Sequence, residues 1–262
     1  MIRTFRAELV KLRRRRVLIV AAMTSIVFAV GGAAVVLMAA EPATPVSYHG
    51  QITREGLAVA GGGTEVFTTA ISYVGTFLFV VFVGATAVEY SRGTFRTMLL
   101  RQPRRFRLLA GKLAALLAFA GVVLALTEVL TWVAALLIAP SQDVSRSAWV
   151  SLDAIGSGLA DYAAVLFWVA GYAVLGMTLG IIVRSVPIAL AIGIAWAGPF
   201  EHLVQEAWAP VSQVFPGLLL EAFVAGGTTD VSAAQAFITI AVYIAAAAAI
   251  GGTLFSRRDV AA

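Results

Sequence analysis

The apolar residues of this chain gather in six long stretches that are separated by shorter polar segments. A helix needs about 20 apolar residues to cross the hydrocarbon layer of a bilayer, so each stretch predicts a transmembrane helix. The fifth is the weakest, because it contains Pro187, Pro199, Glu201 and His202. The pattern predicts an all-α integral membrane protein in which residues 1–262 form one transmembrane domain. Its six predicted spans are 17–40, 66–88, 113–139, 161–183, 186–204 and 233–255.

The first predicted span follows a basic segment, as the apolar part of a signal peptide would. It has no charged residue between positions 17 and 40, which makes it longer than the usual apolar region of about 7–15 residues. Ala39 and Ala40 before Glu41 are only a weak cleavage signal. We therefore expect a retained transmembrane helix.

Composition supports a membrane protein and excludes several kinds of site. The chain is 60% hydrophobic and 13% charged, whereas soluble domains carry about 25% charged residues. It has no cysteine, which excludes disulfides, thiolate nucleophiles and iron–sulfur clusters, and its two histidines are too few for a multi-histidine metal site. We expect no catalytic residue, metal or cofactor in this chain.

The charged residues predict the orientation of the spans. With the six spans above, 17 of the 19 Lys and Arg residues fall on one side, leaving Arg54 and Arg146 on the other. Basic residues are retained on the cytoplasmic side during insertion, so both termini are predicted to be cytoplasmic. The net charge of +5 is then explained by topology and by lipid headgroups, and nucleic-acid binding is not expected.

Residues 1–16 predict a basic amphipathic helix directly before the first span. Ile2, Phe5, Leu9 and Leu12 recur at three- and four-residue steps and so form one stripe along a helix. Such a helix rests in the membrane interface with its stripe in the acyl boundary. The alternative is a positively charged anchor that needs no stripe.

The cytoplasmic segment 89–112 is longer than a simple connection between two spans requires. Gly93 and Thr94 predict a turn, with the threonine hydroxyl capping a new helix. Phe95, Met98 and Leu99 then share one apolar face. This face is either a docking surface for a cytosolic partner or a surface that lies on anionic lipid, and the spacing alone does not decide between them.

Together these features resemble the membrane subunits of ABC-2-type transporters, whose transmembrane domain is that of the type V exporters. The resemblance rests on the basic N-terminal helix, the six spans, and the pattern of Glu89, Gly93-Thr94, Pro103 and Lys112 after the second span. It implies that residues 1–16 form the elbow helix and that 89–112 form the coupling region. It also implies that 205–232 form an outer, partly re-entrant segment. The residues implied to couple to an ATPase are Glu89, Gly93, Thr94, Phe95, Met98, Leu99, Pro103 and Lys112.

The resemblance further implies partners, because this chain has no phosphate-binding loop of the G-x-x-x-x-G-K-[ST] type. ATP and Mg²⁺ would be bound by a separate nucleotide-binding subunit, and a second copy or a paralogue of this chain would complete the transporter in the bacterial plasma membrane. The expected function is that of the permease subunit of an exporter. The alternatives are a secondary transporter or channel without an ATPase, and an assembly or regulatory protein.

Within the spans, Glu128 is the notable charged residue. A carboxylate at mid-bilayer is costly and usually faces the bundle interior or a wet cavity. Glu128, with Thr131 and Trp132, is therefore a candidate for the substrate pathway, and the alternative is a carboxyl group that only packs helices together. Glu201 and His202 are candidates for an outer gate, and the alternative is a solvated pair.

Overall fold

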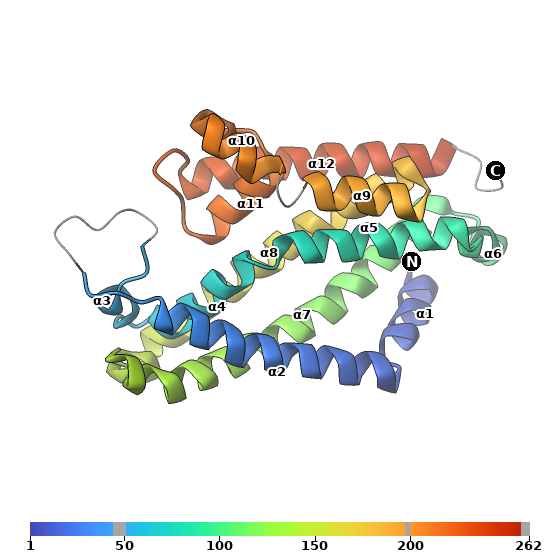
Figure 1. Ribbon diagram of the computed structural model, residues 1–262. Helices are drawn as coiled ribbons and strands as arrows, with labels where there is room; N and C mark the ends of the chain where they lie inside the picture. Colours follow the sequence, from blue (N-terminus) through green and yellow to red (C-terminus); the bar gives the residue numbers. More distant parts are fainter. Residues whose placement is uncertain (44–50, 197–199, 258–262) are drawn as a thin grey trace.

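The computed structural model describes residues 1–43, 51–196 and 200–257, which fold into a bundle of helices (Figure 1). In this part of the chain the only β pairings are two isolated bridges, so the structure contains no sheet there and the all-α prediction is confirmed. Three 3-10 turns connect some of the helices: η1 (Ala139–Gln142), η2 (Ser147–Val150) and η4 (Ala209–Gln213). The helices are α1 (Ile2–Leu12), α2 (Arg15–Met38), α3 (Arg54–Leu57), α4 (Gly62–Ser72), α5 (Gly75–Ser91), α6 (Thr94–Arg101), α7 (Arg105–Ile138), α8 (Leu152–Val183), α9 (Val186–Ala195), α10 (Glu201–Ala207), α11 (Pro216–Val224) and α12 (Ala233–Arg257).

Four described helices, α2, α7, α8 and α12, are long and apolar enough to cross a membrane. A fifth span exists if α4 and α5 are counted together, although Gly62–Ser72 and Phe77–Ser91 are bent by 53°. These helices correspond to the predicted spans 17–40, 66–88, 113–139, 161–183 and 233–255. The multi-pass prediction is therefore confirmed, but the number of six spans is confirmed only in part.

The predicted span 66–88 is wrong as a single straight helix, since α4 ends at Ser72 and α5 begins at Gly75. The rings of Trp168 and Tyr172 on α8 are buried and stand directly against Gly75, where an added Cβ would lie 2.7 Å from the Trp168 ring. The chain thus changes direction where α8 presents its largest side chains. Hydropathy does not register such a bend, because both halves are apolar on average.

In the predicted span 186–204 the structure describes two helical segments, α9 and α10. Helix α9 has ten residues, which is about 15 Å at 1.5 Å per residue and roughly half of a bilayer. Residues 197–199, with Pro199, lie outside the described part, and α10 begins at Glu201. Beyond it, η4 and α11 occupy the segment 205–232 that was predicted to be re-entrant.

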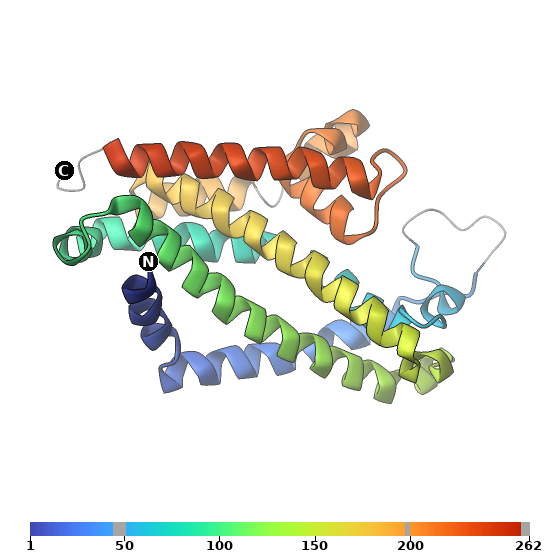
Figure 2. The same ribbon diagram turned by 180° about the vertical axis from the view of Figure 1, so that it is seen from behind.

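Helix α8, the yellow helix that runs diagonally across Figure 2, is the most buried of the four described helices that are long enough to cross a membrane. Gly176 and Gly180 lie one turn apart on its side facing α5. An added Cβ would lie 3.0 Å from the Phe79 carbonyl oxygen at Gly176, and 2.8 Å from the Thr86 Cβ at Gly180. Only glycine permits this separation of the two helices. The main core therefore forms where α5 and α8 meet.

The bundle has two distinct ends. The start of α1, helix α6 and the C-terminal end of α12 lie at one end, which we call the α6 end (Figures 1 and 2). The opposite end, which we call the η1 end, contains the connection η1–η2 and helix α3, and helices α10 and α11 lie toward it. The first residues of the chain and the described end of α12 thus lie at the same end of the bundle, whereas the side of the membrane on which both termini lie stays a prediction.

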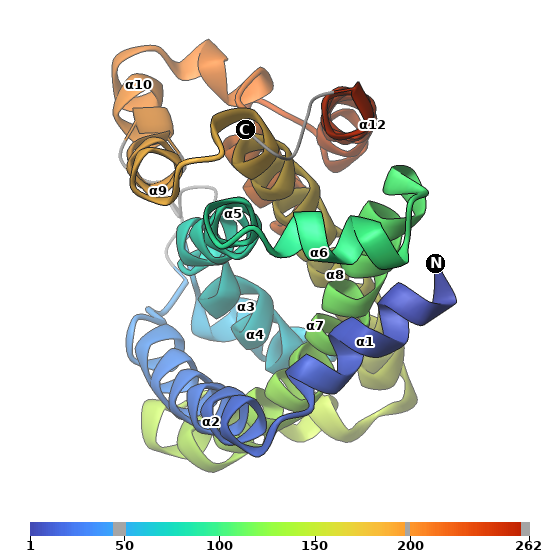
Figure 3. The same cartoon turned by 90° about the vertical axis from the view of Figure 1, so that its right-hand side faces the viewer.

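Helix α1 crosses the α6 end beside α7 (Figure 3). Its buried residues are Thr4 and Glu8, whereas Ile2 is exposed and Phe5, Leu9 and Leu12 are half-buried. The helix and its position before the first span were predicted. The pattern did not predict that two polar residues, Thr4 and Glu8, would be the most buried part of the helix, with most of the apolar stripe only half-buried beside them.

Candidate functional site

At the α6 end, the connection between two spans is built around a glycine. Gly93 has φ +62°, a left-handed conformation that glycine adopts at little cost, and α6 begins at the next residue. The predicted turn is confirmed, but the predicted threonine cap is wrong. Thr94 is already the first helical residue, the N-cap is Gly93, and no side chain caps the helix.

The apolar face of α6 packs into the protein's own interior. Phe95 is fully buried in a cluster with Leu108 of α7, Ile181 of α8 and Phe255 of α12. Its ring centroid lies 4.7 Å from that of Tyr90 and 5.0 Å from that of Phe255. Met98 and Leu99 pack against the same cluster. The face that spacing predicted as a docking or lipid-facing surface is thus an internal contact with four helices.

The opposite face of α6 is exposed. It carries Arg96, Thr97 and Leu100, and Leu100 is 83% exposed. Arg92 just before the helix and Pro103 just after it are exposed as well. A partner at this end of the bundle would therefore contact a basic surface with one prominent leucine, which we call the outer face of α6 (Arg92, Arg96, Thr97 and Leu100).

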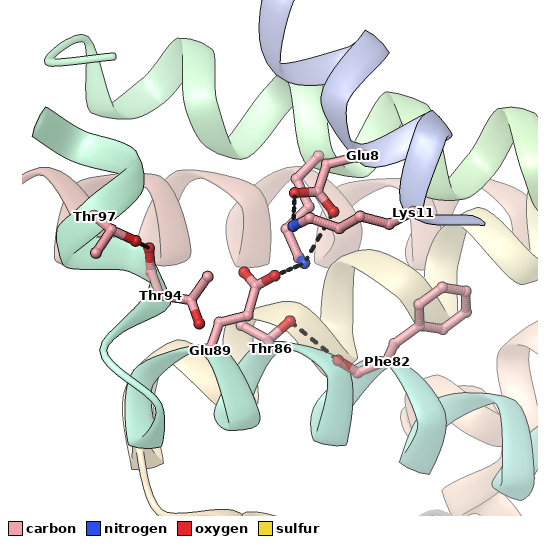
Figure 4. A network of polar contacts seen from close by, with 8 residues as sticks. Glu8, Lys11, Phe82, Thr86, Glu89, Thr94 and Thr97 are labelled. Atoms are coloured by element: carbon pink, nitrogen blue, oxygen red, sulfur yellow. Dashed lines mark hydrogen bonds and ion pairs between the residues drawn. The ribbon is translucent and has the colours of Figure 1, made fainter. Parts of the chain in front are cut away.

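Beneath α6, four charged residues form a continuous series of ion pairs (Figure 4). The Lys112 Nζ donates to Glu89 Oε1 at 2.7 Å and lies 3.9 Å from Glu8 Oε2. Lys11 Nζ in turn donates to Glu8 Oε1 at 2.6 Å. This ion-pair chain (Lys11, Glu8, Lys112 and Glu89) joins α1, α7 and α5.

The middle of the ion-pair chain is well buried. The side chains of Lys112, Glu8 and Glu89 are 4%, 7% and 12% exposed. Removing charges from water costs several kcal/mol for each ion, and close opposite charges offset that cost only when the geometry is good. The second carboxylate oxygen of Glu89 is buried and has no hydrogen-bond partner among the described residues. The arrangement therefore holds α1 against the bundle by charges that are costly to separate.

The structure brings some of the predicted coupling residues together and separates others. Glu89 and Lys112, which are 23 positions apart, form a direct ion pair. Lys112 lies in α7, which begins at Arg105. Gly93 and Thr94 form the turn, and Phe95, Met98 and Leu99 lie on the inner face of α6.

A second candidate site lies toward the η1 end, between α4, α7 and α8. It is a pocket of about 510 Å³, and Glu128 and Trp132 are among the residues that line it. Thr131 does not line the pocket. It is fully buried, and its hydroxyl donates to the Thr127 carbonyl at 2.8 Å. Two of the three predicted pathway residues are thus together at one cavity.

One further acid, Asp161, lies near Glu128, and it in turn interacts with Glu65; the pattern did not connect these residues. Asp161 of α8 is within electrostatic range of both Glu128 and Glu65 of α4. The sequence contains a signal for this proximity, since Glu65 directly precedes the predicted second span and Asp161 begins the fourth. Both residues therefore lie at the same edge of the membrane. We call Glu65, Glu128 and Asp161 the acidic group.

Glu201 and His202, the candidates for an outer gate, do not act as one pair. The Glu201 carboxylate is buried and accepts a hydrogen bond from the Leu218 amide at 3.0 Å, which fixes α10 against the start of α11. His202 Nε2 instead lies 3.3 Å from Glu221 Oε2, and its side chain is about half exposed. Although Glu201 and His202 are adjacent in sequence, their side chains therefore contact different residues of α11.

Comparison with known proteins gives a family but no described activity. The matching family is described as "Protein of unknown function (DUF2705)", and it covers residues 18–261, from α2 to beyond the end of α12. Comparison with curated proteins and with solved structures finds no match. The matched region includes the pocket and the residues of α5, α6 and α7 at the α6 end, but it does not include α1. The chain belongs to the DUF2705 family, as a multi-pass membrane protein of helical bundle architecture.

Proposed function

We propose that this chain is the permease subunit of an ABC-2-type transporter, and that it works as an exporter with a separate ATPase seated on the outer face of α6. The proposal extends the resemblance of residues 1–16 and 89–112 to that family. ATP and Mg²⁺ would be bound by the ATPase subunit, and a second copy or a paralogue of this chain would complete the membrane part.

The position of α6 is the observation that carries the proposal. A short helix lies across the predicted cytoplasmic end, where its inner face is fixed by Phe95 and its outer face presents Arg96, Thr97 and Leu100. A connection that only joined α5 to α7 would not require a helix, nor one whose inner face is packed against the rest of the bundle. An exposed leucine among arginines is suited to contact with another protein, since interfaces combine apolar contacts with arginine.

The contacts of α6 also provide a route for transmitting movement. The Phe95 cluster includes residues of α7, α8 and α12, and Tyr90 adds α5. A displacement of α6 by the ATPase would therefore act on four helices at once, and the ion-pair chain would carry it to α1. The difference in affinity of the ATPase for two arrangements of the helices would supply the bias between inward- and outward-facing states.

Co-purification tests the proposal directly. The tagged chain is purified from its own cells in mild detergent, and we expect a polypeptide with a Walker motif and an ATPase activity in the eluate. The variant Leu100→Arg on the outer face of α6 should lose this partner while keeping its thermal stability. Ala7→Arg, at an exposed position of α1, is the matched control and should retain it. An eluate without an ATPase, or equal recovery with Leu100→Arg, would contradict the proposal.

A secondary transporter is a second candidate, and the acidic group favours it. Within the acidic group, Glu128 is buried and lies within electrostatic range of Asp161, and acids inside a membrane bundle are typical of proton or cation pathways. Proteoliposomes that contain only this chain separate the two functions. Substrate movement driven by a pH or sodium gradient without any ATPase would support the second candidate, whereas transport that requires the ATPase and ATP would support the first.

A further inference from the structure

We propose that the η1-end pocket binds an organic cation with a bulky apolar body, which enters sideways from the bilayer. The site is a single cavity between α4, α7 and α8, away from the outer face of α6. Binding to it does not depend on an ATPase partner. The inference therefore goes beyond the proposed function and can be tested on the purified chain alone.

The walls of the pocket are aromatic and held in place. They include Trp132, Trp149 and Tyr162, and the volume of about 510 Å³ is within the range of about 300–1,000 Å³ typical of small-molecule sites. Trp149 Nε1 donates to the Leu57 carbonyl at 2.8 Å, and the Tyr162 hydroxyl donates to the Gly121 carbonyl at 3.0 Å. Both rings are thereby fixed before any ligand arrives. Faces of Trp and Tyr rings attract cations through their π electrons.

The acidic side chain in the pocket has no basic partner among the lining residues. Glu128 is 9% exposed, lines the pocket, and makes no hydrogen bond or ion pair with any residue that the structure describes. Asp161 lies within electrostatic range of Glu128 and adds further negative potential nearby. The lining contains no Lys, Arg or His. A buried carboxylate without a partner is costly, and a bound cation would offset that cost.

The surroundings of the pocket favour an organic cation over a metal ion. Val129, Ile155 and Leu159 border it and are exposed, so its mouth is apolar and suits a ligand dissolved in the hydrocarbon layer. A hydrated metal ion would not cross such a mouth readily. Among the described residues there is also no group of three side chains that could hold a metal ion.

Two probes of the same shape and opposite charge provide the sharpest test. Tetraphenylphosphonium and tetraphenylborate are each equilibrated with nanodiscs that contain the purified chain, and binding to empty nanodiscs is subtracted. We expect saturable binding of the phosphonium and none of the borate. Glu128→Gln should weaken phosphonium binding at least ten-fold, because the amide has the shape of the carboxylate without its charge. Thr131→Val should leave binding unchanged, since Thr131 does not line the pocket.

A second variant tests the route without altering the charge. Val129→Trp adds a large ring at the exposed mouth and should reduce phosphonium binding at least five-fold. Val122→Trp is the matched control, two helical turns earlier on the exposed side of α7 and outside the lining. Equal binding of both probes, or unchanged binding with both Glu128→Gln and Val129→Trp, would overturn the proposal. Neither result would affect the proposed ATPase contact at the other end.

Discussion

The two ends of the bundle treat buried charge in opposite ways. At the α6 end, two acids and two lysines alternate, and every member of the ion-pair chain has an oppositely charged neighbour within 4 Å. Toward the η1 end, the buried Glu128 lies within electrostatic range of another acid, Asp161, and no Lys, Arg or His lines the pocket that Glu128 faces.

This difference separates a structural use of charge from a functional one. Paired charges stabilise one arrangement of α1, α5 and α7, and they make that arrangement costly to disrupt. Like charges that are gathered inside a protein destabilise it, so their position is explained by a ligand or a proton that occupies the site. The α6 end is therefore expected to lose stability when its charges are removed, and the η1 end to gain it.

Surface labelling tests whether the two ends lie on opposite sides of the membrane, and its expected effect is all-or-none. The chain has no cysteine, so Ser147→Cys on η2 and Thr97→Cys on α6 each introduce a unique thiol at an exposed position. A membrane-impermeant maleimide should label Ser147→Cys in intact cells, and Thr97→Cys only after permeabilisation. Labelling of Thr97→Cys in intact cells would place α6 outside and remove the ATPase proposal.

Lys112→Met should cause the largest loss of stability. It removes the central cation and leaves Glu8 and Glu89 buried without it, at an expected cost of about 3–5 kcal/mol in the free energy of unfolding. Thermal unfolding in detergent measures the effect. Tryptic cleavage at the arginines between α1 and α2 reports release of α1.

The matched control for Lys112→Met neutralises all three buried charges. The triple variant with Glu8→Gln, Glu89→Gln and Lys112→Met should be more stable than Lys112→Met alone, because no uncompensated charge remains. If Lys112→Met unfolds at the temperature of the wild-type chain, the ion-pair chain does not hold α1 in place.

Sequence patterns were sufficient for features that depend on composition and short-range spacing. The four long spans, α1, and the turn at Gly93 followed from apolar runs, a stripe and a glycine. The bend between α4 and α5 was not predictable, because the rings of Trp168 and Tyr172 that occupy it lie about 90 positions away. The resemblance placed Glu89 and Lys112 in the same coupling region, but it did not predict that they form an ion pair. The inner face of α6 was predictable as apolar, but what it contacts depends on Phe255 at the other end of the chain.

The two faces of α6 should differ sharply in their effect on stability. Phe95→Ala removes a fully buried ring from the contact of four helices and should lower the free energy of unfolding by about 3 kcal/mol. Leu100→Ala removes an exposed side chain and should change it by less than about 0.5 kcal/mol. Comparable losses in the two variants, measured by thermal unfolding of the purified chain, would show that Leu100 has an internal contact.

Glu128→Gln should have the smallest effect, and its sign is opposite to that of Lys112→Met. Without a ligand, the amide avoids the cost of a buried charge and its repulsion by Asp161, so stability should rise by about 1 kcal/mol. Glu206→Gln, at an exposed position of α10, is the control for general charge effects and should remain close to the wild-type chain. Thermal unfolding of the ligand-free protein measures both variants. A clear loss of stability in Glu128→Gln would mean that the carboxylate holds helices together, and the contrast between the two ends would then disappear.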